Sequence, residues 1–300
     1  MILGIDPKVD YAFKHLLGRE STRPILIDVI DKVLSPAPGH QIQDIELLNP
    51  FNPKETSDDK LSILDIKARD QAGRQFNIEM QMLAFPQYDK RILYYWARLY
   101  QQQLHEGEGY RQLKPTISIS FLGHVLFPEV PDFHLRFRLK EESHHFAFTD
   151  NMDFHILELP KFIKSGAELD SSRLDIWLYF LRHAEKMDKE ALPAALQQPL
   201  IYRALEELEM LTKTEEERER YEARHKAQLD YNTIMTAARE EGREEGREEG
   251  REEGEKIGMI HLCERLLGRP QTPTEQLASL SLDDLTRLAN ELQEEVLKKR

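Results

Sequence analysis

Residues 60–82, KLSILDIKARDQAGRQFNIEMQM, decide how we interpret the rest of the chain. Two runs of strand-forming residues flank the polar segment 70–74 (DQAGR), in which Gly73 suits the left-handed position of a three-residue hairpin loop. With the loop at 71–73, Asp70 pairs with Arg74, and Asp65 lies directly across from Glu79 on the neighbouring strand. The sequence therefore predicts a β-hairpin that carries two opposed carboxylates.

Two opposed carboxylates repel each other. Directly paired side chains lie about 5 Å apart at Cβ, and at an effective dielectric constant near 20 the repulsion is on the order of 3 kcal/mol. A shared proton relieves it, and so does a divalent cation held by oxygen ligands. Gln81, two residues beyond Glu79 on the same face, would orient a water beside such a cation. On spacing alone, the alternative is a half-buried hairpin whose outer face carries Asp, Glu and Gln that have no functional role.

An Asp on one strand followed by Glu79-Met80-Gln81 on the next resembles the core of the PD-(D/E)XK nuclease superfamily. Four further blocks resemble its recombination-promoting nuclease (Rpn) branch, the PD-(D/E)XK family transposases. They are DPKVDYAFKHLLG at 6–18, YDKRILYYWARLYQQQL at 88–104, MDFHILELPKF at 152–162 and LDIWLYFLRH at 174–183. The resemblance spans about residues 5–235. It implies an α/β fold, namely a restriction-endonuclease-like α/β/α core with a mixed sheet, followed by a C-terminal helical tail.

The same resemblance implies a metal site. Asp65 and Glu79 would hold Mg²⁺ (or Mn²⁺), the backbone carbonyl of Met80 would be a further ligand, and Gln81 would position the attacking water. Gln81 departs from the superfamily pattern, in which a lysine is commoner at this position, although the Rpn branch tolerates glutamine. An acidic residue on the first helix often completes such a site, which makes Asp10 the candidate. The alternative for Asp10 is stabilisation of the helix dipole at the start of a helix over residues 9–17.

Cationic and aromatic residues near these acids are candidates for DNA binding. Lys14, one turn beyond Asp10, would touch phosphate or pair with Asp10. Lys67 shares the strand face of Asp65. In the helix predicted after the hairpin, Arg91, Tyr94 and Arg98 recur at i, i+3 and i+7, a combination that suits a phosphate backbone or an unstacked base. The alternative is a solvated helix face.

Apolar and basic residues alternate in a second segment, residues 133–140. Phe133, Leu135, Phe137 and Leu139 alternate with His134, Arg136, Arg138 and Lys140. The alternation predicts a strand with its apolar residues inward. Its cations would either protect a sheet edge from pairing or contact DNA.

Composition restricts the class of protein. Three hundred residues suit one sizeable domain with an appendage. The net charge of −13 argues against a protein that coats nucleic acid generally, although it leaves room for a local DNA groove. The single cysteine, Cys263, excludes an internal disulfide framework. A single cysteine makes a reducing intracellular compartment the default, so we expect a cytoplasmic protein. No apolar run approaches the roughly 20 residues that cross a bilayer, so we expect no membrane contact.

The pattern along the chain predicts four parts. We expect a nuclease-like domain at 1–203, a charged helical extension at 204–238, a REEG-repeat linker at 239–258 and a small helical module at 259–300. Glycine at every fourth position of the repeat costs about 1 kcal/mol each in a helix, so this segment is either a marginal helix or a flexible spacer. We expect it to lack contacts with the first domain. The glycine row would also let two helices approach closely, which would give a homo-oligomer through the tail.

These observations lead to two hypotheses. The first is a Mg²⁺-dependent DNA endonuclease that hydrolyses phosphodiester bonds, linked to recombination or transposition-like DNA processing. The second is a non-catalytic DNA-binding or assembly protein that retains the nuclease fold. Gln81 in place of a lysine is the sequence feature that favours the second hypothesis.

Overall fold

The computed structural model describes residues 3–49, 51–52, 62–63, 65–170 and 173–298. The chain divides into two compact units, Met1–Gln228 and Leu229–Arg300. Lys60, Leu61 and Leu64, which belong to the first predicted strand of the hairpin, lie outside the described residues.

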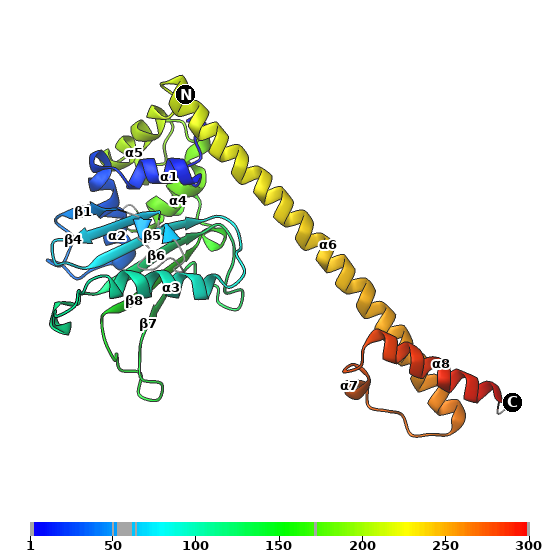
Figure 1. The fold of residues 1–300 in the computed structure, drawn as a ribbon. Helices are drawn as coiled ribbons and strands as arrows, with labels where there is room; N and C mark the ends of the chain where they lie inside the picture. Colours follow the sequence, from blue (N-terminus) through cyan, green and yellow to red (C-terminus); the bar gives the residue numbers. More distant parts are fainter. Residues whose placement is uncertain (1–2, 50, 53–61, 64, 171–172, 299–300) are drawn as a thin grey trace. The chain divides into compact units, whose positions relative to one another are not determined.

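A six-stranded mixed sheet forms the centre of the first unit (Figure 1). Its strands, in spatial order, are β1 (Ile45–Leu48), β4 (Ile66–Asp70), β5 (Gln75–Gln81), β6 (Thr116–Leu122), β8 (Met152–Glu158) and β7 (His134–Arg138). The pairs β5–β6 and β6–β8 are parallel, whereas β1–β4, β4–β5 and β7–β8 are antiparallel. Two short strands, β2 (Phe51–Asn52) and β3 (Ser62–Ile63), pair separately. The prediction of a mixed sheet is confirmed.

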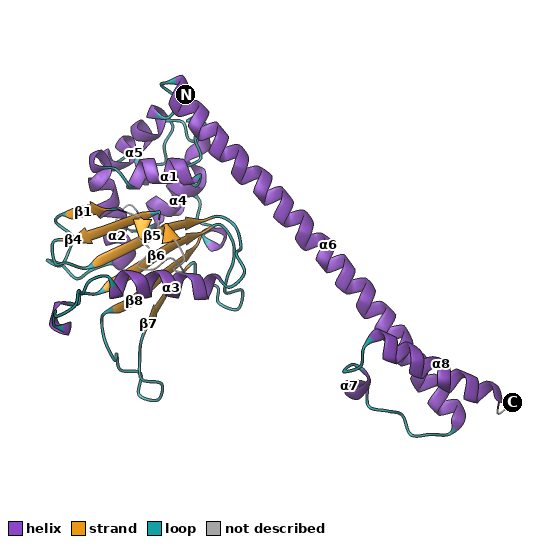
Figure 2. Ribbon diagram, viewed as in Figure 1, coloured by secondary structure: helices purple, strands orange, loops and turns teal. Residues whose placement is uncertain are grey.

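Helices cover both faces of this sheet (Figure 2). The core on one face is formed with α1 (Asp10–Leu17), α2 (Arg23–Leu34), α4 (Asp175–His183) and α5 (Pro199–Met210). On the other face lies α3 (Tyr88–Gln101), whose Tyr88 and Ile92 pack on Leu122, Phe154 and Ile156. Short 3₁₀ helices join these elements: η1 (Glu20–Thr22), η2 (Tyr110–Gln112), η3 (Leu159–Lys161), η4 (Gly166–Glu168), η5 (Ala184–Lys186) and η6 (Ala194–Leu196). The three layers are those of the α/β/α core expected from the sequence.

Strand β5 is buried on both faces because helices cover both sides of the sheet. Phe76, Ile78 and Met80 belong to the core formed with α1, α2, α4 and α5. Asn77 and Glu79 alternate with them and therefore point toward the α3 side, where they are 1% and 3% exposed. The fold thus holds a carboxyl group in its interior.

The basic row on β7 has partners within its own sheet. Arg136 donates two hydrogen bonds to Asp153, at 3.0 and 2.6 Å, and Arg138 pairs with Asp150. β7 is the outermost strand, as the edge interpretation requires, and its charges are already paired. The expectation that its apolar residues all point into the core is wrong. Phe137 and Leu139 are 42% and 44% exposed because an edge position covers them on one flank only.

The core of the first unit extends past residue 203, where the sequence predicted the domain to end. Ala204, Leu205, Leu208 and Leu211 of α5 and its C-terminal end are buried in it, as is Tyr221. The hydroxyl of Tyr221 accepts a hydrogen bond from the backbone N–H of Asp6 at 2.9 Å. The charged extension is therefore attached to the domain through its apolar side chains.

The second unit contains a small apolar core of its own. It is made by the C-terminal end of α6 (Glu215–Leu267), by α7 (Thr274–Leu277) and by α8 (Leu282–Lys298). Its buried members are Ile260, Cys263, Leu277, Leu285, Ala289 and Leu292. The helix α6 runs without interruption through the REEG repeat, so the structure adopts the helical alternative for this segment. Pairs such as Arg247–Glu244 and Arg251–Glu255 support the repeat locally.

Candidate active site

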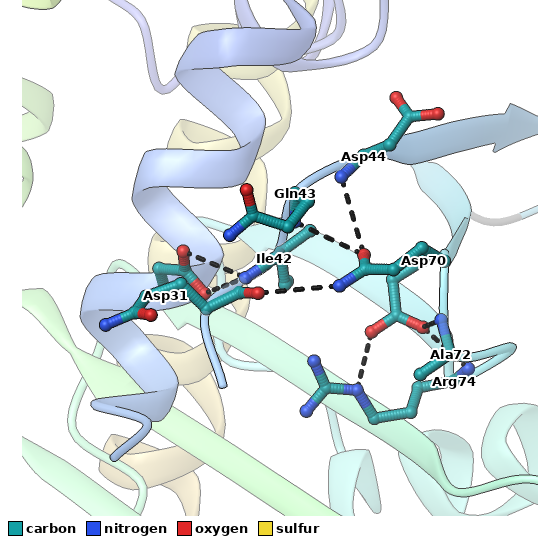
Figure 3. Close-up of polar contacts among 9 residues, drawn as sticks. Asp31, Ile42, Gln43, Asp44, Asp70, Ala72 and Arg74 are labelled. Atoms are coloured by element: carbon teal, nitrogen blue, oxygen red, sulfur yellow. Dashed lines mark hydrogen bonds and ion pairs between the residues drawn. The ribbon is translucent and has the colours of Figure 1, made fainter. Parts of the chain in front are cut away.

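The hairpin has the register that the sequence predicts. Ile66 pairs with Ile78, Lys67 with Asn77, and Arg69 with Gln75. In the loop, Gly73 adopts a φ of +82°, and the Asp70 carboxylate accepts hydrogen bonds from the N–H groups of Ala72 and Arg74, both at 2.9 Å. It also accepts one from the Arg74 guanidinium (Figure 3). This buried cap holds the loop at three residues.

A second group of contacts attaches the loop to the segment before β1. The Gln71 side-chain oxygen accepts the N–H groups of Gln43 and Asp44, at 3.3 and 3.4 Å. Nearby, the Asp31 carboxylate of α2 accepts the N–H of Ile42 at 3.1 Å (Figure 3). The hairpin is therefore tied to α2 through the chain that enters the sheet, and these contacts hold β4, the strand that follows Asp65.

Asp65 lies immediately before β4 and contacts two other elements. Its Oδ2 accepts the backbone N–H of Met80 on β5 at 3.0 Å. Its Oδ1 pairs with the Lys14 ammonium of α1 at 3.1 Å, and the same ammonium lies 2.6 Å from Asp10 Oδ1. Asp10 and Lys14 of α1, Asp65 just before β4 and Met80 of β5 are thus brought together.

Glu79 lies on the face of β5 that α3 covers. Its Oε1 accepts a hydrogen bond from the Asn77 amide at 3.1 Å, and its Oε2 lies 3.7 Å from the Arg91 guanidinium of α3. That Oε2 is buried and has no hydrogen-bond partner among the described residues. Since an unpaired buried polar atom is costly, this oxygen requires a ligand, a water or a proton.

The electrostatics connect the two acids. Burial, reinforced by the negative charge of Asp65, raises the pKa of Glu79 to about 7 against the smaller opposing effects of Arg91, Asn77 and Lys14. Burial also raises the pKa of Asp65, although the Lys14 ammonium opposes it. The effect of Asp65 on the pKa of Glu79 has the sign expected for repulsion between two carboxylates.

The donors fit a hard divalent cation. Mg²⁺ is commonly held by one or two carboxylates and keeps several waters. The Asp65 carboxylate, the Glu79 Oε2 that accepts no hydrogen bond from the described residues, and the Met80 carbonyl are therefore suitable ligands for it. Within the described ranges, no three or more His, Cys, Asp or Glu side chains form a metal-binding group. Asp10 is close to Asp65, but the Lys14 ammonium contacts both carboxylates.

Two further candidate site residues, Gln81 of β5 and Arg91 of α3, contact groups other than Asp65. The Gln81 amide donates to the Leu83 carbonyl at 2.9 Å. The Arg91 guanidinium lies over the rings of Phe85, Tyr88 and Tyr95, at 5.2, 5.7 and 5.4 Å from their centroids. Such cation–π contacts hold it in place beside Glu79. Arg91 is thus part of the acidic site as well as of the predicted DNA-binding face.

The other predicted DNA contacts are partly exposed. Tyr94 is 39% exposed and its ring lies 6.2 Å from that of Tyr95. Arg98 is half-buried on α3. Lys67 donates to the Gln102 side chain at 3.1 Å, and burial lowers the pKa of its ammonium.

Sequence reasoning missed the polar residues around Glu79. Asn77 donates to it directly, and Ser120 and Ser118 of β6 pair with Glu79 and Asn77 in the parallel ladder. Both serine hydroxyls are buried and have no hydrogen-bond partner in the described part of the chain. The position of Asn77 two residues before Glu79 was a usable signal, whereas the serines come together with it only through tertiary pairing.

The mixed sheet between two helical layers, with Asp65 just before β4 and Glu79 on β5, has the arrangement expected of a PD-(D/E)XK nuclease-like protein. The family model of the PD-(D/E)XK nuclease family transposases matches residues 7–238, so the chain belongs to this family. Comparisons with curated proteins and with solved structures give no match. Family membership indicates a nuclease-like function. Among the described residues, no helix is both long and apolar enough to span a membrane.

Proposed function

We propose that the protein is a metal-dependent DNA endonuclease that hydrolyses phosphodiester bonds in recombination or transposition-like DNA processing. The observation that carries this proposal is the buried Glu79 carboxylate, whose Oε2 accepts no hydrogen bond from the described residues and whose pKa is raised by burial and by the charge of Asp65. Two acids that repel each other are stabilised by a cation, and family membership supplies the class of reaction.

In this proposal each residue has a defined task. Asp65, Glu79 and the Met80 carbonyl would hold Mg²⁺ (or Mn²⁺), which when bound neutralises phosphate charge and lowers the pKa of water. The Met80 N–H orients the Asp65 carboxylate, and the Asn77 amide orients that of Glu79. Gln81 positions the attacking water, and Asp10 supports the site through Lys14.

DNA would bind beside this site along α3. Tyr94 offers an exposed ring on which an unstacked base can stack. Arg91 and Arg98 would bind phosphates from the same helix, and Lys67 and Lys14 would do so from β4 and α1. We place the protein in the cytoplasm because a chain with a single cysteine fits a reducing compartment.

A metal comparison on supercoiled plasmid tests the proposal. Purified protein should nick or linearise the DNA with Mg²⁺ or Mn²⁺ and leave it intact with EDTA. Asp65→Ala, purified in the same way, serves as the blank and should cut at least about 1,000-fold more slowly, because it lacks a metal ligand. Cutting by Asp65→Ala at the wild-type rate would refute the site.

A non-catalytic DNA-binding or assembly protein is the second candidate. The observation that favours it is Gln81, whose amide is bonded to the Leu83 carbonyl where the superfamily motif has a lysine. If this candidate is correct, the protein should slow the migration of plasmid DNA in a gel even when EDTA is present. It should cut the plasmid under none of the metal conditions.

The tail is proposed to act separately from the nuclease-like domain. The Cβ positions built on Gly242, Gly246, Gly250, Gly254 and Gly258 meet no atom within 4 Å, so this face of α6 is open to a second helix. We expect a truncation after Ala238 to keep the thermal melting temperature and metal-dependent cutting of the full chain, and to lose any self-association seen by sedimentation. A truncated protein that fails to fold would show that the tail belongs to the domain.

A further inference from the structure

Position 81 brings no positive charge to the site. The PD-(D/E)XK superfamily motif ends in lysine, whereas this chain has Glu79-Met80-Gln81. The Gln81 amide is neutral, and its N–H donates to the Leu83 carbonyl at 2.9 Å. Hydrolysis of a phosphodiester increases negative charge on the phosphoryl oxygens, and a cation held beside them is a large source of catalysis.

Lys14 brings such a charge from another element. Its ammonium lies 3.1 Å from Asp65 Oδ1 and 2.6 Å from Asp10 Oδ1, and 37% of its side chain is exposed. The helix that carries it is fixed by buried Ala12 and Phe13, the latter packing edge-on against Phe121 of β6 at 6.1 Å. The ammonium is therefore held beside the proposed metal ligand and is still accessible from solvent.

We propose that Lys14 is a catalytic residue that supplies, from α1, the ammonium absent from position 81. This inference rests on the proposed endonuclease function. An ammonium has three N–H donors, so the two carboxylate contacts leave one for a non-bridging phosphate oxygen. Arg91, the other cation at the acids, is enclosed by three aromatic rings and approaches Glu79 from the opposite side of the sheet to α1.

Lys14 takes part in the reaction as a hydrogen-bond donor. The oxygen of a water molecule forms a bond to phosphorus, while the bond between phosphorus and the leaving deoxyribose oxygen breaks with its electron pair on that oxygen. A proton released by the attacking water reaches the leaving oxygen through solvent, which gives a phosphomonoester and an alcohol. Lys14 donates a hydrogen bond to the phosphoryl oxygen whose charge grows, and it transfers no proton.

The test moves the charge from one position to the other. Lys14→Met and Lys14→Gln remove the ammonium, and the glutamine keeps N–H donors for Asp10 and Asp65. Each should lower kcat for plasmid cutting at least about 100-fold. Because Lys14 is also one of several phosphate contacts, the Kd for DNA should rise by a smaller factor, about tenfold or less. Adding Gln81→Lys to Lys14→Met should recover at least about tenfold of the lost rate. Lys189→Met is the matched control, because Lys189 also contacts two carboxylates, Glu209 at 3.2 Å and Glu206 at 3.7 Å, and should cut normally.

The outcomes are distinguishable. Folded Lys14 variants that cut at the wild-type rate overturn the inference and leave the endonuclease function in place. A loss of cutting that Gln81→Lys does not restore also overturns it, because Lys14 then acts only as a structural ion pair. If Lys14→Met does not fold, the cutting rates of Lys14→Gln and of its double variant with Gln81→Lys are compared instead. A wild-type protein that cuts under no metal condition refutes the function itself.

Discussion

Glu79→Gln is expected to abolish cutting and, in the metal-free protein, to increase stability at alkaline pH. The amide cannot supply the negative charge that binds a metal, so kcat should fall at least about 1,000-fold, equivalent to roughly 4 kcal/mol of activation free energy. The stability effect has the opposite sign because it comes from the burial of a charge.

The pH dependence follows from the pKa of about 7 in the folded state, raised first by burial and then by Asp65 from an ordinary value of 4.5. Between these values the folded state binds a proton that the unfolded state has lost, so the free energy of unfolding decreases as pH rises. At pH 8 the ionised carboxylate costs on the order of 3 kcal/mol. Urea unfolding in EDTA should therefore show Glu79→Gln more stable than the wild type at pH 8, with most of the difference gone at pH 5.

Glu46→Gln is the matched control, because Glu46 lies on β1 of the same sheet with an exposed side chain that pairs with Arg69. Its stability should follow the wild type at both pH values. A Glu79→Gln protein that is equally stabilised at pH 5 and pH 8 would contradict the assignment of the raised pKa to this carboxyl group.

Asp70→Ala is expected to destabilise the domain and to slow cutting without touching the site. The change removes the acceptor of the Ala72 and Arg74 N–H groups and leaves the Arg74 guanidinium without its buried partner. Breaking a buried ion pair from one side costs about 3–5 kcal/mol. A loosened loop also permits a slip of one residue, which would turn Glu79 away from Asp65.

Urea unfolding and plasmid cutting measure the two effects of Asp70→Ala. Asp44→Ala serves as the comparison, because Asp44 pairs with Arg23 from an exposed position and its removal should cost less than about 1 kcal/mol. Similar losses in the two variants would show that the Asp70 cap does not fix the hairpin.

The elements that the sequence predicted well are those whose pattern is local. The alternation on each side of Gly73 set the hairpin register, and the helical spacing of Tyr88, Ile92 and Leu99 identified the buried face of α3. The contacts of Lys14 with Asp65 and of Ser120 with Glu79 required the packing of distant segments, which no local pattern records.

The REEG segment shows the limit of helix propensity. Five glycines predicted a weak helix, yet α6 is continuous from Glu215 to Leu267. Tyr221 packs in the core of the first unit, and Ile260 and Cys263 pack in that of the second. Because helix nucleation is the unfavourable step, packing at both ends lets the glycine-rich middle propagate from turns that already exist.

The position of β5 has a consequence for how the protein loses activity. Its backbone is paired with β4 on one side and β6 on the other, and its residues from Phe76 to Met80 are buried. Amides in such a strand exchange with solvent deuterium only when the whole domain opens. Glu79 is therefore carried by the part of the molecule that opens last, and progressive denaturation should remove protection of β5 amides and plasmid cutting in a single transition.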